Sequence, residues 1–223
     1  MLSNDTSTDT ASRNRRHEDA DVARARREIR DTVESWAVWR DAGDWERFAT
    51  VWHDDGHMTA TWFQGLYTDF IRVSREGFDR GVRILHFLGG CSVDVVGDRA
   101  VSQTKMTISQ RAEIDGVGID VLCTGRFFDF FERRAGRWGI VRRQPIYEKD
   151  QLFMIDPTKV LTLDRVLLDS YPTGYRHLAY LQAKQGFTVK RDLPGLVGEA
   201  VDELYGAGAA WLDGAPTAGI PLH

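Results

Sequence analysis

The chain contains few cysteines: only Cys91 and Cys123 occur among its 223 residues. Two cysteines are too few for a disulfide scaffold or for a four-cysteine zinc site. Both lie in apolar, strand-like stretches of the sequence. We therefore expect two reduced, buried thiols in a cytoplasmic protein.

Long apolar runs and an excess of basic charge are also missing. No run approaches the ~20 residues of a membrane span, and the first twenty residues lack the apolar centre of a signal peptide. The chain has 29 Lys and Arg against 33 Asp and Glu, a formal net charge of −4. We therefore expect a soluble protein that binds neither nucleic acid nor a membrane surface.

Changes of pattern divide the chain into three parts. Residues 1–17, rich in Ser, Thr, Asn and Asp, are expected to form a disordered N-terminal tail. Residues 18–155 are expected to form one α+β domain, because helical patterns are followed by a long series of strands. Residues 156–223 contain expected helices near 174–185 and 196–212. Since no long linker precedes them, we expect a helical C-terminal extension packed on the domain.

Helical periodicity dominates the first part of the domain. Ile29, Val33 and Trp36 form one apolar stripe, which predicts a helix over residues 18–42. A short second helix is expected over "DWERFATVWHDDG", closed by its final "DDG", and a third over "DFIRVSREGFDRGV". The segment between them, "HMTATWFQGLY", has the alternation of a strand.

Four long strands are expected next. The runs "ILHFLGGCSVDVV", "AVSQTKMTISQRAEI", "IDVLCTGRFFDFFERR" and "WGIVRRQPIYEKD" are separated by tight turns that carry Gly with Asp or Arg. Such turns favour an antiparallel meander. Helices followed by a long antiparallel sheet predict a cone-shaped α+β barrel, in which a curved sheet carries the helices across its concave face.

A single histidine interrupts the first of these strands. His86 shares strand parity with Ile84 and Leu88, whereas Phe87 belongs to the opposite, more apolar face. A β-bulge at the glycine pair 89–90 would exchange the two faces beyond it. The residues alone allow a hydrogen-bonded core histidine, a metal ligand or a general base.

Three stretches resemble the SnoaL-like branch of the nuclear transport factor 2-like superfamily. They are "WAVWRDAGDWERFATVWHDDG", "ILHFLGGCSVDVVGDRA" and "GRFFDFFERRAGRWGIVRR", and the resemblance covers roughly residues 20–150. The family includes scytalone dehydratase, a hexachlorocyclohexane dehydrochlorinase, polyketide cyclases, isomerases and non-catalytic binding proteins. The resemblance therefore implies the fold more specifically than the reaction.

The pattern of the dehydratase–dehydrochlorinase group implies a catalytic set. The family's helix aspartate falls on Asp41, its strand histidine on His86 and a late-strand arginine on Arg143. A lysine used by the dehydrochlorinase falls on Trp36, and the asparagine that often follows the histidine falls on Gly90. Halide elimination with the same leaving-group assistance is therefore not implied.

The chemistry of an aspartate–histidine pair needs no cofactor. A neutral imidazole removes a proton from carbon, and a carboxylate on its other nitrogen fixes the tautomer. We expect a cofactor-independent lyase of the dehydratase type acting on a small hydrophobic, aromatic substrate. An isomerase or cyclase and a non-catalytic ligand-binding protein are the alternatives. The expected substrate-binding residues are Trp36, Trp39, Trp62, Tyr67, Arg126, Phe128 and Tyr147.

Other assignments of the polar residues remain open. Asp41 lies at the edge of the apolar stripe and is alternatively a solvated helix-end carboxylate, while Arg40 falls closer to the stripe and is a further pocket candidate. The cluster "HDDGH" has metal-ligand types, but Gly56 breaks its helical spacing, so no metal site is expected. The apolar sheet face leads us to expect a homo-oligomer, a dimer or trimer.

Overall fold

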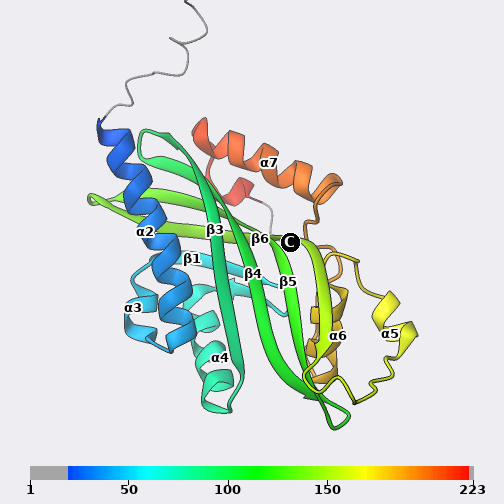
Figure 1. Ribbon diagram of the computed structural model, residues 1–223. Helices are drawn as coiled ribbons and strands as arrows, with labels where there is room; N and C mark the ends of the chain where they lie inside the picture. Colours follow the sequence, from blue (N-terminus) through cyan, green and yellow to red (C-terminus); the bar gives the residue numbers. More distant parts are fainter. Residues whose placement is uncertain (1–19, 221–223) are drawn as a thin grey trace, which may run out of the picture.

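The core of the fold is a meander of four consecutive strands. The computed structural model describes residues 20–220, and within them adjacent strands of the meander pair antiparallel throughout (Figure 1). Asp115 (φ 50°) and Gly116 (φ 78°) form one of the connections, with the two positive φ angles of a type I′ turn. The predicted meander is confirmed. Its strands are β3 (Arg83–Val96), β4 (Arg99–Ile114), β5 (Val117–Arg134) and β6 (Arg137–Met154).

Two further strands complete a curved, unclosed sheet. In residues 20–220 its six strands have the order β2-β1-β6-β5-β4-β3, with β1 (Trp52–Ala60) parallel to β6 and antiparallel to β2 (Phe63–Leu66). The expected cone-shaped α+β fold is confirmed. The helix expected over residues 44–56 is wrong beyond its first turns. Helix α3 is Trp45–Ala49, because Trp52 already pairs with Ile140 of β6.

A bulge in β3 decides which side chains face the helices. Leu88 pairs with Met106 but Cys91 pairs with Thr104, so β3 has one more residue than β4 across this interval. Ile84 and His86 therefore share the concave face with Cys91 and Val93, although the first two residues have even numbers and the last two have odd numbers. The opposite face of the first half of β3 carries exposed apolar side chains, Phe87 at 62% among them.

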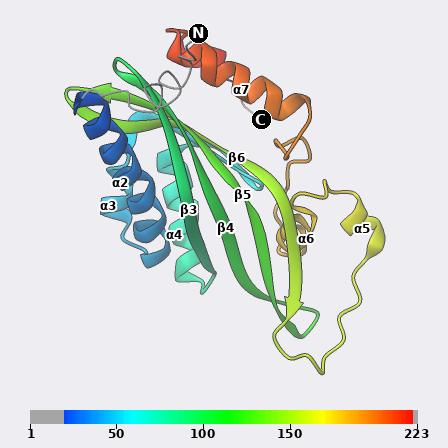
Figure 2. The same cartoon turned by 45° about the horizontal axis from the view of Figure 1, so that its top comes forward.

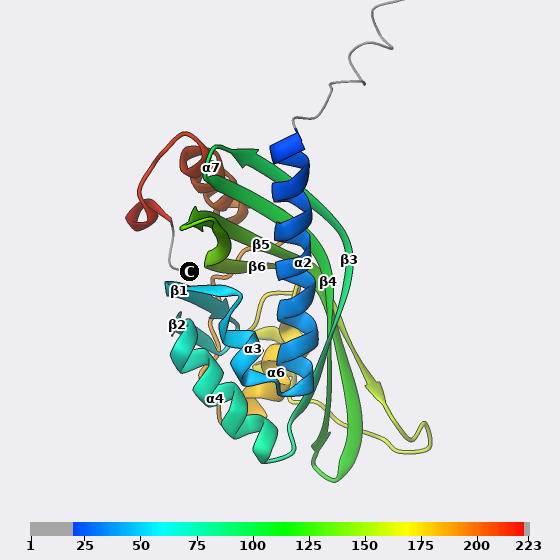
Figure 3. The same cartoon turned by 90° about the vertical axis from the view of Figure 1, so that its left-hand side faces the viewer.

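Helices cover the concave face of the sheet (Figure 3). Helix α2 (Ala20–Ala42) runs along β3 and buries the predicted stripe of Ile29, Val33 and Trp36. Helix α4 (Tyr67–Asp79) contacts β1 and β2. Helix α6 (Arg176–Lys184), from the C-terminal extension, packs on β4, β5 and β6 and closes the far end of this face.

The rest of the extension packs elsewhere. Helix α5 (Arg165–Asp169) contacts α6, and α7 (Glu199–Leu212) crosses the opposite face of the sheet, well away from α5 and α6 (Figure 2). On α7, Trp211 is 1% exposed and donates its indole N–H to the Phe131 carbonyl oxygen at 3.2 Å, while the Arg99 guanidinium lies 4.0 Å from its ring. A short 3₁₀ helix, Thr217–Gly219, follows.

The N-terminal tail expected over residues 1–17 lies outside the described residues. Within residues 20–220, no helix combines the length and the apolar character that a membrane span requires.

We predict that α7 contributes to the stability of the whole fold. Trp211→Ala should lower the free energy of unfolding by about 3–5 kcal/mol, the usual cost of emptying a buried Trp site. Urea denaturation measures the change. As a matched control in the same extension, Val197→Ala, at a side chain 83% exposed, should stay within about 0.5 kcal/mol of wild type. Equal stabilities of all three proteins would contradict the prediction.

Candidate functional site

The side chain of His86 is fixed by Asp41 at the edge of the sheet. The Asp41 Oδ1 atom lies 2.8 Å from Nδ1 of the His86 ring, and Oδ2 accepts the backbone N–H of His86 at 2.5 Å. Strand β3 is the last strand of the sheet, so this N–H has no neighbouring strand to bind. The end of α2 thus supplies the acceptor that the strand edge lacks, and both carboxylate oxygens are used.

This contact determines the tautomer of the neutral ring. An ionised carboxylate only accepts hydrogen bonds, so Nδ1 carries the proton and Nε2 keeps its lone pair. Among the described residues, nothing hydrogen-bonds to Nε2. Burial lowers the pKa of His86 below its usual value of about 6.5; Asp41 opposes this shift, while Arg40 and Arg143 add to it. The ring is therefore a neutral base at neutral pH.

His86 lies on the wall of a small cavity inside the cone, which we call the inner chamber. Its volume is about 40 Å³, and it adjoins a larger cavity of about 320 Å³, the outer chamber, since both are lined by five common residues. The outer chamber has the size of a small-molecule pocket. We call the shared residues the neck; they are Arg40, Trp62, Ile84, Gln110 and Gln182.

Three of the aromatic residues expected to bind substrate do line these chambers. Trp36 and Tyr147 form part of the inner chamber, and Trp62 belongs to the neck. The Trp36 ring meets the His86 ring edge-on, with 5.1 Å between the centroids. Burial raises the pKa of Tyr147 well above its usual value, so this side chain stays a neutral phenol.

Four of the expected substrate-binding residues lie elsewhere. Trp39 and Tyr67 pack against the outside of the core, Tyr67 being stacked on Trp52 at 5.8 Å. Side chains of β5 alternate between the two faces, so Phe127 points into the cone whereas Phe128 packs against α7. Arg126 also faces away from the chambers.

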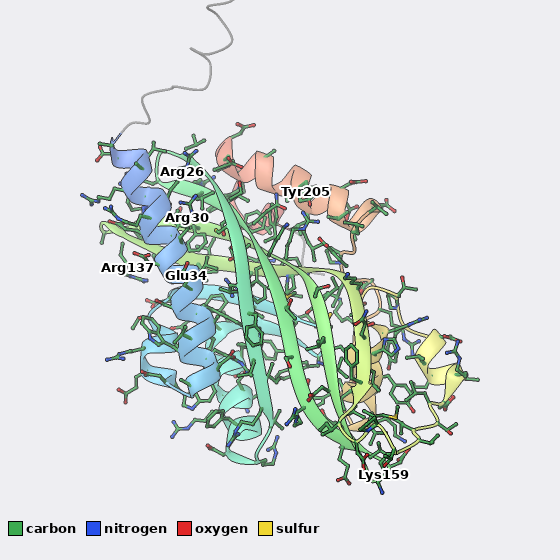
Figure 4. The ribbon with its side chains drawn as sticks, viewed as in Figure 1. Arg26, Arg30, Glu34, Arg137, Lys159 and Tyr205 are labelled. Atoms are coloured by element: carbon green, nitrogen blue, oxygen red, sulfur yellow. The ribbon has the colours of Figure 1, made fainter. Side chains whose placement is uncertain are left out.

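The contacts of Arg126 belong to the opposite face. Its guanidinium binds Glu148 at 2.7 Å, Gln103 at 2.7 Å and the hydroxyl of Tyr205 on α7, the helix on which Figure 4 labels that residue. Arg126 and Phe128 were expected from the sequence to bind substrate, but they lie on the face opposite the chambers, because the parity of a strand does not tell which face the helices cover.

Arg143 faces the inside of the cone but lies behind the chamber wall. Its Nε and Nη2 atoms donate to the two carboxylate oxygens of Asp129 at 2.6 and 2.7 Å, and both side chains are completely buried. The guanidinium lies 4.3 Å from the Trp36 ring centroid and 4.0 Å from that of Phe127, the two residues that separate it from the chamber. Its effect on His86 is therefore exerted through space.

Arg40, named from the sequence as a further pocket candidate, does line both chambers, whereas two other chamber residues, Gln110 and Gln182, were not singled out. Arg40 continues the spacing of the apolar stripe after Val33 and Trp36, which was the available signal. Gln110 occupies an inward position of β4 two residues after Ile108. Gln182 follows Leu178 by one helical turn on α6, and no pattern in the extension linked that helix to the cone.

A second aspartate–histidine pair repeats the first without reaching a chamber. His177 Nδ1 lies 2.8 Å from Asp150 Oδ1, and the backbone N–H groups of His177 and Leu178 donate to Asp150 Oδ2 at the start of α6. His177 lines neither the inner nor the outer chamber. This pair anchors a helix end, and it offers a matched control for His86.

Within residues 20–220, no group of three or more His, Cys, Asp or Glu side chains is placed to hold a metal ion. In "HDDGH", His53 binds the Glu132 carbonyl oxygen at 2.8 Å, and Asp55 pairs with Arg134 at 2.6 Å. The segment belongs to strand β1 and does not end a helix. Its His53 and Asp55 side chains make structural contacts.

Solved structures share this architecture. The crystal structure of a putative scytalone dehydratase from Novosphingobium aromaticivorans aligns with a TM-score of 0.50 and 17% identity, over 62% of this chain and 97% of that chain. The structure of LinA aligns with a TM-score of 0.51 and 16% identity, over 65% of this chain and 97% of that chain. At these identities the likeness shows the fold alone.

Sequence comparison gives nearer relatives. Pea pathogenicity protein 2 of Fusarium vanettenii is 38% identical over 204 residues, covering 86% of this chain and 88% of that protein. The PEP2-like protein NECHADRAFT_97050 of the same fungus is 39% identical over 200 residues, covering 85% and 86%. Residues 21–144 match the family described as the SnoaL-like domain. The chain therefore belongs to the SnoaL-like domain family, within the nuclear transport factor 2-like fold.

Proposed function

We propose that this protein is a cofactor-independent lyase of the dehydratase type, acting on a small hydrophobic, aromatic substrate. One observation carries the proposal: the neutral imidazole of His86 has its Nδ1 bound to Asp41, while the ring itself forms part of the inner-chamber wall. A buried, oriented base at the end of a pocket has the arrangement that proton abstraction from carbon requires. The putative scytalone dehydratase and LinA, which share the fold, are consistent with it.

In the proposed reaction, His86 Nε2 takes a proton from a carbon atom of the substrate. The electron pair of that C–H bond forms a carbon–carbon double bond, and the neighbouring C–O bond breaks. The imidazolium returns its proton to the departing hydroxide, so the products are an unsaturated compound and water. Asp41 keeps the ring in the reactive tautomer and stabilises the imidazolium while it exists.

The two chambers support an assignment of the substrate class. The outer chamber accommodates a molecule of the size of a substituted aromatic ring, and Trp62, Phe63 and Phe187 offer it apolar contacts. The inner chamber has room for only a few atoms, so the reacting carbon enters through the neck. Arg143, paired with Asp129, acts in this scheme by lowering the pKa of His86 from behind the wall.

An isomerase or cyclase would use the same base. A binding protein would use the same pocket and would not need the base. Product mass separates these functions. A dehydratase product is lighter than its substrate by one water, whereas an isomerase product has the substrate's mass and incorporates deuterium from heavy water. A panel of β-hydroxy ketones and β-hydroxy acids bearing an aromatic ring is the first set to test.

We predict that His86→Gln abolishes turnover without unfolding the protein. Loss of a general base typically costs about 10²–10⁴-fold in rate. Mass spectrometry of the product panel measures activity, and circular dichroism checks the fold. The matched control is His177→Gln, which removes a histidine with the same hydrogen-bond pattern outside the chambers and should keep turnover near wild type. Unchanged activity in His86→Gln would eliminate the proposed mechanism.

We predict that Asp41→Asn reverses the tautomer of His86. The asparagine oxygen would accept the His86 backbone N–H, so its NH₂ group would face Nδ1 and leave the proton on Nε2, where it blocks the base. Nitrogen-15 NMR of the ring distinguishes the two tautomers without any substrate. An Nδ1–H ring in both proteins would contradict the role of Asp41.

The pH dependence follows from the lowered pKa of His86. Protonation removes the base, so activity should be lost as the pH falls, through a midpoint below about 6.5. The same midpoint should appear in the NMR titration of the His86 ring. A midpoint above 6.5 would show that burial does not dominate the environment of this histidine.

A homo-oligomer and a cytoplasmic location stay predictions. The exposed apolar side chains Leu85 and Phe87, 49% and 62% exposed on β3, support the first. Phe87→Glu should shift the molecular mass measured by light scattering toward that of the 25.3 kDa chain. A wild-type protein that is already monomeric would contradict this expectation.

A further inference from the structure

The neck contains a buried cation that the protein leaves incompletely bound. The Arg40 side chain is 8% exposed and lines both chambers. Its Nη1 atom donates to Asp41 Oδ1 at 3.4 Å and to the Ile84 carbonyl oxygen at 3.3 Å, both at the long end of the hydrogen-bond range. Its Nε atom is buried and finds no acceptor among the described residues.

The charge of Arg40 is only weakly balanced. Its nearest carboxylate, Asp41, directs its two oxygens at His86 over 2.8 and 2.5 Å, so Arg40 receives the longer and weaker contact. Burial lowers the pKa of Arg40, and Asp41 opposes that shift. A buried guanidinium with unused donors is costly to the protein unless an acceptor reaches it.

Neighbouring polar atoms in the two chambers are also unused. The Oε1 atom of Gln110, a residue 3% exposed, has no donor among residues 20–220, and its amide nitrogen makes only a 3.4 Å contact with Gln185. The hydroxyl of Ser74, 5% exposed on the wall of the outer chamber, is likewise without a partner there. An amide can turn to present either its oxygen or its NH₂ group, so Gln110 adapts to a polar ligand.

We propose that the neck is an anion-binding site and that the ligand is an aromatic carboxylic acid in its carboxylate form. The Nε and Nη2 atoms form the edge of the guanidinium that binds a carboxylate with two parallel hydrogen bonds, and the protein's own hydrogen bonds occupy Nη1. Gln110 supplies a further donor. The aromatic ring lies in the outer chamber against Trp62 and Phe187.

Turnover of an aromatic carboxylic acid rests on the proposed lyase function, whereas binding of the acid does not. Arg40 is adjacent to Asp41 in the chain, and its charge acts on His86. A carboxylate held by Arg40 therefore brings the carbon next to it toward the imidazole, and negative charge that develops on proton removal is stabilised by the same guanidinium. Binding of the acid itself requires no reaction.

The test compares phenylacetate with phenylacetamide, which has nearly the same shape but no charge. Quenching of tryptophan fluorescence measures binding, because Trp62 lies in the neck and Trp36 in the inner chamber. Wild type should bind phenylacetate at least tenfold more tightly than the amide. Arg40→Gln should remove that preference. Arg75→Gln, the matched control at an exposed arginine of α4 that lines neither chamber, should keep it.

Equal affinities of wild type for the two probes would overturn the proposal, as would an Arg40→Gln protein that still prefers the acid. A measurement on wild type covers the case in which Arg40→Gln does not fold. Phenylacetate should shift the NMR signals of the Trp62 indole and the His86 ring, and shifts confined to residues outside the chambers would overturn the site. A wild-type protein that prefers the acid but turns over no acid would exclude the lyase and leave the anion site standing.

Discussion

The arrangement of the site depends on the contact between the Asp41 carboxylate and the edge of β3. One oxygen binds the backbone N–H of His86 and the other binds its ring, so the same residue places the strand against α2 and orients the imidazole. Arg40 also holds the strand against α2, because it donates a hydrogen bond to the Ile84 carbonyl oxygen on the same edge. Two consecutive residues, Arg40 and Asp41, therefore hold the strand edge, and Asp41 also orients the His86 ring. Removal of the Asp41 side chain would expose an unpaired strand edge as well as release the ring, whereas asparagine alters the ring alone.

The pocket extends beyond the region that defines the family. The family match ends at residue 144, yet Tyr147 lies on the inner-chamber wall and Gln182 of α6 belongs to the neck. The Gln182 amide is itself held by the Thr61 hydroxyl at 2.6 Å, which ties α6 to the segment between β1 and β2. The C-terminal extension thus completes the cavity on one face of the sheet, while α7 stabilises the other face. The walls of the chambers therefore include residues that lie beyond the matched SnoaL-like domain.

The fold was predictable from local sequence patterns, but which side chains face the interior of the cone was only partly predictable. Alternation and glycine-containing turns suffice to predict the meander, because both are properties of neighbouring residues. Which face is inward depends on the bulge at Gly89–Gly90, which moves Val93 to the side of His86. The inward face also depends on α7. Because α7 packs on one face of β5, both faces of this strand are apolar, and the sequence does not show that Phe127 faces the cone while Phe128 faces α7. The pairing of Asp41 with His86 came from the resemblance, since residues 45 positions apart carry no spacing signal.

Charge balance within the cone links the proposed base to the kind of ligand that its reaction would require. Asp129 neutralises Arg143 through two short hydrogen bonds, and Asp41 is the single carboxylate that Arg40 and His86 share among the described residues. With a neutral imidazole these four charges sum to zero. Transfer of a proton to Nε2 would leave one uncompensated positive charge in a buried space, and the low dielectric there makes that state costly. The cost falls if negative charge arises on the ligand within reach of Arg40. A ligand whose acidic carbon adjoins a carboxylate or carbonyl group meets this condition, whereas a purely hydrocarbon ligand does not.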